Sequence, residues 1–154
     1  MTSVGYRPTI QFPRSPEERA DPALAWQRTD EAFFASGACH ILAFTFCDQH
    51  PDRDLVLRSI EPLPGFIGSH VYVADGDWAL DFNGWTPEAE LLAVTEAAWS
   101  AAHPGWTYEL RDLDTDLETF CADHLHRAPR YFAHDPRPRA RAYLTRFSDR
   151  PPST

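Results

Sequence analysis

Residues 33–49 read FFASGACHILAFTFCDQ, and this stretch decides the fold of the chain. Residues 38–49 are apolar nearly all the way round, a pattern typical of a central helix that is buried on every side. Gly37 separates this run from the helical pattern before it, and Pro51 stops it. The sequence therefore predicts a buried helix over 38–49 with Cys39 at its start.

The chain before this helix divides into an arm and a helical region. Residues 1–14 are rich in turn and breaker residues, so we expect an extended, loosely held arm. Residues 15–37 carry helix signals, because Ser15 can cap a helix whose first residue is Pro16. We predict one helix that begins there and ends at Gly37.

The chain after the central helix follows the shorter period of strands. Runs of β-branched or alternating residues at 55–60 and 106–113 each predict a strand. The apolar runs 70–74 and 78–82 are separated by Asp-Gly-Asp, and Asp-Gly between two apolar runs is a strong hairpin signal. We expect these strands to form a small antiparallel sheet.

Two helices and a short apolar segment complete the predicted elements. Thr86 as a cap and Pro87 as the first helical residue predict a helix that ends at His103. Residues 114–127 have amphipathic helical spacing and predict another helix. Residues 141–147 fit either a last edge strand or part of a tail.

Strands in the middle of the chain with helices before and after are typical of the α+β class. We predict one α+β domain over 15–135, with the arm 1–14 before it and an Arg/Pro-rich segment, 136–154, after it. Residues 127–154 hold seven Arg and two Asp in a chain of net charge −9. This basic end can pack back on the acidic body, hold an acidic partner, or remain an ordinary solvated terminus.

The bulk composition argues against several classes of protein. A net charge of −9 disfavours nucleic-acid binding, and no run approaches the roughly 18 apolar residues of a membrane span. Three cysteines are too few for a secreted disulfide framework and suit a reducing compartment. The N-terminus lacks a signal-peptide pattern. We expect a cytoplasmic protein of undetermined oligomeric state with no membrane contact, and secretion as an effector without a signal peptide stays open.

Cys39 is the strongest candidate for a reactive residue. The first turn of a helix carries unpaired N–H groups and the positive end of the helix dipole, which favour a thiolate over a thiol. The same N–H groups can bind an oxyanion during acyl transfer. Cys47 and Cys121 lack this setting, and we predict that both are core cysteines.

A nucleophilic cysteine needs a base, and the base needs an orienting acceptor. His70 at the start of a strand is the candidate base. Asp81 in the partner strand is the candidate acceptor, because an acid in an apolar run is costly without a partner. Asn83 is the reserve acceptor. A turn centred on Gly76 places His70 opposite Phe82, beside both acceptors.

The order of a cysteine at a helix start, a histidine on one strand and an aspartate on the next resembles the transglutaminase-like branch of the papain-like cysteine enzymes. SGACHILAF, residues 36–44, resembles the cysteine motif, and HVYVADGDWALDFNG, residues 70–84, resembles the His-to-Asp hairpin. The resemblance covers residues 33–85, about a third of the chain. It implies a cysteine-bearing helix packed on a small antiparallel sheet and acyl-transfer chemistry on an amide or ester.

Other side chains are candidates for the surroundings of this site. Trp85, beyond the bend at Gly84, and Phe66, in a Pro/Gly-rich loop that can act as a lid, are candidate walls of a substrate cleft. Ordinary core or surface packing is the simpler explanation for such residues. His40 follows Cys39, and we expect a buried, hydrogen-bonded histidine rather than a second base, with a place in the cleft left open.

A metal site is the other chemistry that the sequence raises. Cys47 and His50 are ligand types that zinc prefers, but the chain has no second pair of ligands with the spacing of a zinc site. Asp75 and Asp77 in the hairpin turn are explained by turn chemistry. We therefore predict no metal and no cofactor.

Taken together, the sequence predicts a cysteine-dependent acyl-transfer enzyme that works through a thioester on Cys39, with His70 and Asp81 completing a triad. Hydrolysis, deamidation and transfer to an amine all stay open, and the substrate is a protein, a peptide or a small amide or ester. The alternative is a non-catalytic binding or regulatory module, such as a phage, toxin or immunity component, that keeps the same fold.

Overall fold

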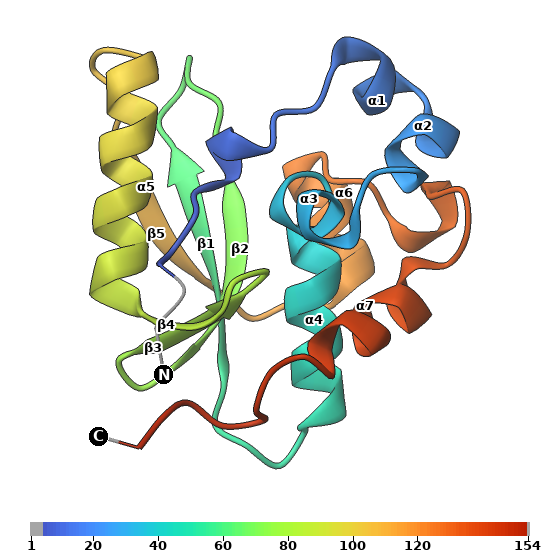
Figure 1. Ribbon diagram of the computed structural model, residues 1–154, viewed down its shortest axis with the longest axis vertical. Coiled ribbons are helices and arrows are strands. Elements are labelled where there is room, and N and C mark those ends of the chain that lie inside the picture. Colours follow the sequence, from blue (N-terminus) through green and yellow to red (C-terminus); the bar gives the residue numbers. More distant parts are fainter. Residues whose placement is uncertain (1–4, 154) are drawn as a thin grey trace.

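The structure, a computed structural model, describes residues 5–153 and consists of a five-stranded antiparallel sheet with helices on both faces (Figure 1). The α+β prediction is confirmed. The strands are β1 Val56–Pro62, β2 His70–Asp75, β3 Trp78–Asp81, β4 Gly84–Pro87 and β5 Tyr108–Leu113. The helices are α1 Pro16–Ala20, α2 Pro22–Trp26, α3 Asp30–Ala35, α4 Cys39–Gln49, α5 Glu88–Ala102, α6 Leu117–His124 and α7 Pro136–Leu144, with single 3-10 turns at η1 Thr9–Gln11 and η2 Pro129–Tyr131.

The strand order β4-β3-β2-β1-β5 places β2 at the centre of the sheet, and every neighbouring pair is antiparallel. Because side chains alternate along a strand, β2 contributes to two cores. Val71 and Val73 belong to the core that contains α4. Tyr72 and Ala74 belong to a second core with α5, which covers the opposite face of the sheet (Figure 1).

Helix α4 is the central buried helix that the sequence predicts. Every residue from Cys39 to Phe46 is buried, because α3, α6 and α7 surround the helix on the side away from the sheet (Figure 1). The turn before it needs a glycine, since Gly37 has φ +112°, in the region that other residues rarely adopt. The turn and the all-apolar helix together fix Cys39 as the first residue of α4.

The region before α4 differs from the prediction of one helix over 15–37. It forms three short helices. Asp21 ends α1 and caps α2, which begins at Pro22, and Thr29 caps α3. The predicted cap at Ser15 is present, as a capping box with Glu18. A loosely held arm is also wrong for residues 5–14, where Tyr6 and Thr9 are buried. Residues 1–4 lie outside the described part.

Two predictions after the hairpin are corrected. Thr86 does not cap α5, because it pairs with Ala79 in the sheet, and Pro87 occupies the cap position without a side-chain hydrogen bond. Residues 141–147 form neither an edge strand nor a tail. They continue α7 and its C-terminal turn, since Asp135 accepts from Arg137 N–H and caps a helix that starts with proline.

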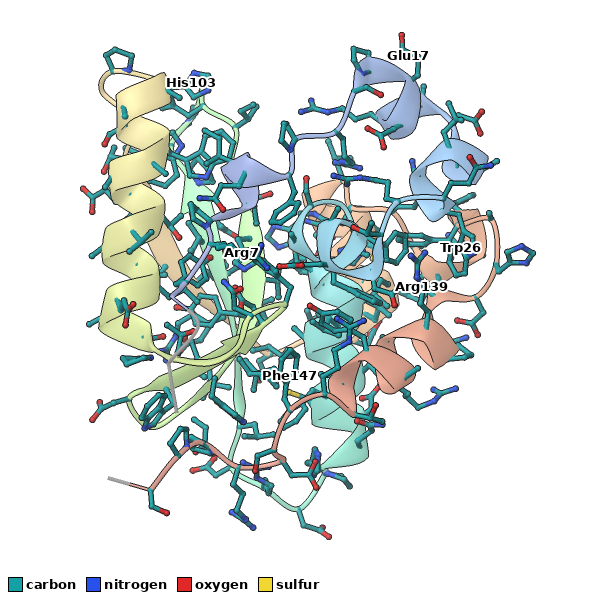
Figure 2. The ribbon with its side chains drawn as sticks, viewed as in Figure 1. Arg7, Glu17, Trp26, His103, Arg139 and Phe147 are labelled. Atoms are coloured by element: carbon teal, nitrogen blue, oxygen red, sulfur yellow. The ribbon has the colours of Figure 1, made fainter. Side chains whose placement is uncertain are left out.

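The basic C-terminal segment packs back on the body of the domain. The Tyr143 hydroxyl of α7 donates to the carbonyl of Phe82, which follows β3. The Arg139 guanidinium pairs with Asp30 at 2.7 Å and lies over the ring of Trp26, 4.8 Å from its centroid, beside which Figure 2 draws it. These contacts attach α7 to both the N-terminal helices and the sheet.

Candidate active site

Cys39 lies at the start of α4 with 6% of its surface exposed. The first helical hydrogen bond runs from Leu42 N–H to the Ala38 carbonyl at 3.2 Å, so the N–H groups of residues 39–41 precede the helical ladder. Ala38 gives no side-chain cap. Backbone donors at the positive end of the helix dipole therefore lie beside the Cys39 thiol.

His70 and Asp81 form a buried pair on the sheet. His70 Nε2 lies 2.9 Å from Asp81 Oδ2, and the two side chains are 1% and 2% exposed. An ionised carboxylate can only accept, so Nε2 carries the hydrogen and donates it to Asp81. This leaves Nδ1 as the histidine nitrogen that is available to the thiol.

The pair forms through a register that differs by one residue from the prediction. Val73 pairs with Leu80 and Asp75 with Trp78, so the turn contains two residues rather than being centred on Gly76. Continued by one pair, this register sets Asp81 opposite Tyr72, two residues from His70. Asp81 then lies on the same face of the sheet as His70, because side chains two residues apart share a face. The shift is what lets the two side chains meet.

Asp81 has further partners that fix its position. Its Oδ1 accepts the backbone N–H of Asn83 at 2.9 Å. The buried hydroxyl of Tyr6, which accepts from Thr95 at 3.4 Å, also lies near the carboxylate. Burial and then the charge of Asp81 raise the pKa of Tyr6 well above its ordinary value, so the phenol stays protonated and can donate to Asp81.

The Cys39 thiol interacts with two imidazole rings. Burial by itself raises the pKa of a thiol, but the neighbouring imidazoles of His40 and His70 hold the Cys39 pKa well below its ordinary value. Burial opposes protonation of His70, yet its hydrogen bond to Asp81 and the nearby sulfur of Cys39 raise the His70 pKa from 6.5 to about 10. A thiolate beside a protonated His70 is the form that these shifts favour at neutral pH.

The thiol and His70 lie near each other without a regular hydrogen bond. His70 Nδ1 is buried and has no hydrogen-bond partner within residues 5–153. Catalytic hydrogen bonds are commonly long or poorly aligned before substrate binds and tighten in the complex. The arrangement of helix thiol, imidazole and carboxylate is therefore that of a nucleophile, a base and an orienting acceptor.

His40, the next residue of α4, is fully buried near the same thiol. Its Nε2 donates to the Arg127 carbonyl at 2.8 Å. Burial opposes protonation, but the nearby sulfurs of Cys121 and Cys39 raise the His40 pKa to about 9. The prediction of a buried, hydrogen-bonded histidine is confirmed, and His40 is not among the residues that line the cleft described next.

A cleft of about 1120 Å³ lies over Cys39. It is bounded by the N-terminal arm, the turn before α4, the loop between β1 and β2, the end of α5 and the region from α6 to residue 127. Phe66, predicted for its wall, is present, and Trp99 lies against Gly68, where a Cβ would come within 2.7 Å of the indole. Figure 2 labels His103 at the end of α5 that borders this cleft.

Two residues predicted near the site lie elsewhere. Trp85 packs edge-on against Phe46 and donates its Nε1 hydrogen to the Ser148 carbonyl at 2.8 Å, so it does not line the cleft. The Asn83 side chain points to the Arg7 carbonyl at 3.4 Å, while His70 Nε2 is already bonded to Asp81. The role of reserve acceptor is therefore wrong for the Asn83 side chain, whose backbone N–H supports Asp81 instead.

The other two cysteines differ from Cys39. Cys47 is half-buried near the end of α4, and burial followed by the charge of Asp48 raises its pKa to about 11. Cys121 is buried in α6, donates weakly to the Arg127 carbonyl at 3.6 Å, and borders the cleft. The pKa of Cys39 is thus held below its ordinary value, whereas that of Cys47 is raised.

The described residues lack two features, a cluster of metal ligands and a membrane-spanning helix. Within residues 5–153 no group of three or more His, Cys, Asp or Glu side chains is placed to hold a metal ion. Over the same part of the chain, no helix combines the length and the apolar character that crossing a membrane requires.

Several residues around the site carried no signal in the sequence. Tyr6 and Arg14 come from the arm that was expected to be extended, and Arg127 belongs to the segment after α6. Tyr6 lies near Asp81, and Arg127 bonds to Arg19, so these pairs join positions more than 70 residues apart that no local pattern reveals.

Comparison of the chain with protein-family models, with curated proteins and with solved structures gave no match in any of the three. The proposed function therefore rests on the geometry of the site.

Proposed function

We propose that this chain is a cysteine-dependent acyl-transfer enzyme in which Cys39 is the nucleophile, His70 the general base and acid, and Asp81 the residue that orients His70. The observation that supports this most is the buried His70, whose Nε2 is bonded to Asp81 at 2.9 Å while its other nitrogen is left to a thiol at the base of a cleft. A histidine held in one tautomer beside a thiol of lowered pKa is what nucleophilic catalysis needs.

The acylation step follows from these positions. The Cys39 sulfur attacks the carbonyl carbon of an amide or ester, and a C–S bond forms as the C=O pair moves to oxygen. Backbone N–H groups at the start of α4 stabilise the resulting oxyanion. Protonated His70 then gives its Nδ1 proton to the leaving amine or alcohol as the C–N or C–O bond breaks, and a thioester remains on Cys39.

The second step releases the acyl group. Neutral His70 takes a proton from water, or from an acceptor amine, as that nucleophile attacks the thioester. The C–S bond breaks and the thiolate returns beside the imidazolium. Asp81 keeps its carboxylate form throughout and stabilises the charged ring. Hydrolysis, deamidation and amine transfer differ only in which amide enters and which nucleophile completes the cycle.

The resemblance to transglutaminase-like and papain-like enzymes agrees with this proposal. In that superfamily the cysteine begins a helix packed on an antiparallel sheet whose strands supply the histidine and aspartate. Here α4 packs on β2, and the two other residues come from β2 and the end of β3. Two apolar side chains at the cleft are exposed, Leu125 at 94% and Ile67 at 54%. They offer an apolar surface on which a peptide-sized substrate could bind.

An acylating ester tests the proposal directly. Wild-type protein is incubated with 4-nitrophenyl acetate near neutral pH, nitrophenolate release is followed, and the acetyl group is located by peptide mass spectrometry. We expect acetylation of Cys39 alone and its loss in Cys39→Ala. Cys47→Ala is the matched control, since it removes a thiol from the same helix outside the cleft, and it should behave as wild type.

The same experiment distinguishes the non-catalytic alternative. Equal acetylation of Cys39, Cys47 and Cys121, or none on Cys39 in a folded protein, would contradict the enzyme and favour a binding module. Iodoacetamide at pH 6.5 gives an independent readout, because alkylation reports the thiolate without needing a substrate. Cys39 is expected to react at least about 100-fold faster than Cys47, whose pKa is raised to about 11.

A further inference from the structure

The charges around the cleft are unlike those of the rest of the chain. The sequence contains 23 Asp and Glu and has a net charge of −9, yet no acidic residue is among the described residues that line the cleft. Three arginines and three histidines do line it. They are Arg14, Arg19, Arg127, His103, His124 and His126.

The arginines elsewhere are mostly neutralised. Within residues 5–153, nine of the fourteen arginines form an ion pair with a carboxylate. Those without such a pair are Arg14, Arg19, Arg127, Arg141 and Arg150. Three of these five lie in the cleft, so the unpaired positive charge of the chain gathers beside Cys39.

Arg14 lies against the turn that precedes Cys39. An ideal Cβ on Gly37, two residues before Cys39, would lie 3.1 Å from Arg14 Nη1. Arg14 Nε is buried and has no hydrogen-bond partner within the described residues. Burial lowers the pKa of Arg14, and the neighbouring charges of Arg19 and Arg127 lower it further. A partly desolvated guanidinium among like charges is costly unless an anion pairs with it.

Arg127 is held in place rather than left mobile. Its Nη2 donates to the Arg19 carbonyl at 2.8 Å, and its guanidinium lies 5.4 Å from the centroid of Phe132. Its own carbonyl accepts from His40 at 2.8 Å, so the residue that carries this charge is attached to the surroundings of the thiol. Preorganised cations beside a nucleophile favour a negatively charged ligand.

Glu18 and Glu61, which adjoin lining residues in the sequence, have partners other than the three arginines. Glu18 accepts from the backbone of Ser15 at 2.9 Å and pairs with Arg28 at 3.3 Å. Glu61 pairs with Arg111 at 2.8 Å and lies 3.3 Å from His124 Nδ1. His124 is thus balanced by Glu61, and the net positive charge rests on the three arginines.

From these observations we infer that the cleft selects acyl donors that carry a carboxylate close to the scissile carbonyl, and that Arg14 is the residue that recognises it, with Arg127 and Arg19 adding charge at longer range. This substrate class rests on the proposed function, because it assumes that Cys39 receives the acyl group. A planar carboxylate suits a guanidinium, which can donate two parallel hydrogen bonds.

A pair of alkylating reagents tests the inference without a known substrate. Iodoacetate and iodoacetamide both transfer a two-carbon group to the thiolate sulfur as iodide leaves, and they differ in whether that group carries a carboxylate. The second-order rate constants for Cys39 are measured by peptide mass spectrometry, and their ratio, iodoacetate over iodoacetamide, is compared among variants. We expect Arg14→Gln to lower this ratio about tenfold.

Matched variants separate recognition from general charge. Arg141→Gln removes the same charge from an exposed arginine of α7 that does not line the cleft, and its ratio should equal that of wild type. Arg14→Lys should keep most of the preference, since the charge remains. If Arg14→Gln does not fold, the wild type alone still answers, because raising NaCl from about 20 to 500 mM should slow iodoacetate and leave iodoacetamide unchanged.

Failure of the two proposals looks different in this experiment. If Cys39 reacts no faster than Cys47 with either reagent, the proposed function falls and the substrate class falls with it. If Cys39 is the fast thiol but the ratio is the same in wild type, Arg14→Gln and Arg141→Gln, the substrate class alone is overturned. A matched pair of esters, the mono-4-nitrophenyl ester of glutaric acid and 4-nitrophenyl pentanoate, extends the comparison to acyl transfer, with a preference for the glutarate that Arg14→Gln removes.

Discussion

Two histidines lie near the Cys39 thiol, and the groups behind them differ. His70 is backed by the carboxylate of Asp81 at 2.9 Å, and His40 by the backbone carbonyl of Arg127 at 2.8 Å. A carboxylate carries a full charge that stabilises an imidazolium, whereas a carbonyl offers only a dipole. Burial opposes protonation of both rings. Asp81 contributes most to raising the His70 pKa to about 10, whereas Cys121 and Cys39 contribute more than the Arg127 carbonyl to raising the His40 pKa to about 9.

Two imidazoles near the same thiol can therefore have different roles. Both rings leave Nδ1 without a hydrogen-bond partner within the described residues, but His70 comes from a strand and belongs to a charge-assisted pair with a further donor on Asp81. His40 follows Cys39 in the same helix and joins α4 to the segment after α6. We expect proton transfer at His70 and support of the thiolate at His40.

A pair of glutamine variants should show the largest difference between the two histidines. Glutamine carries an amide N–H at about the position of histidine Nε2, so His70→Gln can still donate to Asp81 and His40→Gln to Arg127, while both lose the titrating ring. We expect His70→Gln to lower the rate of Cys39 acetylation about 1000-fold and His40→Gln less than about 10-fold. Equal losses in two folded variants would remove the distinction between the rings.

Removal of the charge behind His70 should have the next largest effect. Asp81→Asn keeps the size of the side chain but leaves the imidazolium without its counter-charge, so we expect acetylation to fall about 100-fold. The buried pair also loses a charge-assisted hydrogen bond, and the free energy of unfolding should fall by about 1–3 kcal/mol. Activity against 4-nitrophenyl acetate and urea denaturation measure the two effects, and an unchanged rate would show that Asp81 has only a structural role.

The pH dependence of alkylation shows whether Cys39 is already a thiolate at neutral pH and whether His70 keeps it so. Because the Cys39 pKa is held well below its ordinary value, iodoacetamide should react at nearly the same rate at pH 7 and pH 9, whereas an ordinary thiol gains about tenfold per pH unit below 8.5. His70→Gln should restore part of that slope. A wild-type profile that rises steeply up to pH 9 would contradict a preformed thiolate.

The same shifts set the direction of the stability change. Folding raises the His70 pKa from 6.5 to about 10, so the protonated ring contributes fully below pH 6.5 and its contribution is lost as pH rises through about 10. The lowered pKa of Cys39 works the other way, with a contribution that is present above its unfolded pKa and lost as pH falls through the folded one. Denaturation of wild type and Cys39→Ser between pH 6 and 10 measures both.

The smallest effect is expected at Asn83. Its side chain makes one long hydrogen bond, at 3.4 Å to the Arg7 carbonyl, and its contact with Asp81 is through the backbone N–H. Asn83→Ala should therefore change acetylation by less than about twofold and stability by about 0.5–1.5 kcal/mol at most. A loss comparable with Asp81→Asn would mean that the side chain, and not the backbone, positions the acceptor.

The chain's local patterns were enough for much of the fold. The all-apolar run predicts α4, and the Asp-Gly turn between apolar runs predicts the β2–β3 hairpin, because burial on all sides and tight-turn chemistry are both written in adjacent residues. Local signals misled where several caps compete, as at Asp21 and Thr29, which divide one predicted helix into three. They also misled at residues 141–147, where Asp135 and packing against α4 decide for a helix.

The sequence by itself determined the types and order of the candidate site residues: a cysteine at a helix start, a histidine at a strand start and an acid in an apolar strand. Tertiary structure decided which of them meet. A one-residue register brings Asp81 to His70, and the buried arm supplies Tyr6 and Arg14. The reason is physical: helix and strand signals depend on neighbours in the chain, whereas charge balance, desolvation and the alignment of a thiol with an imidazole depend on residues that only folding brings together.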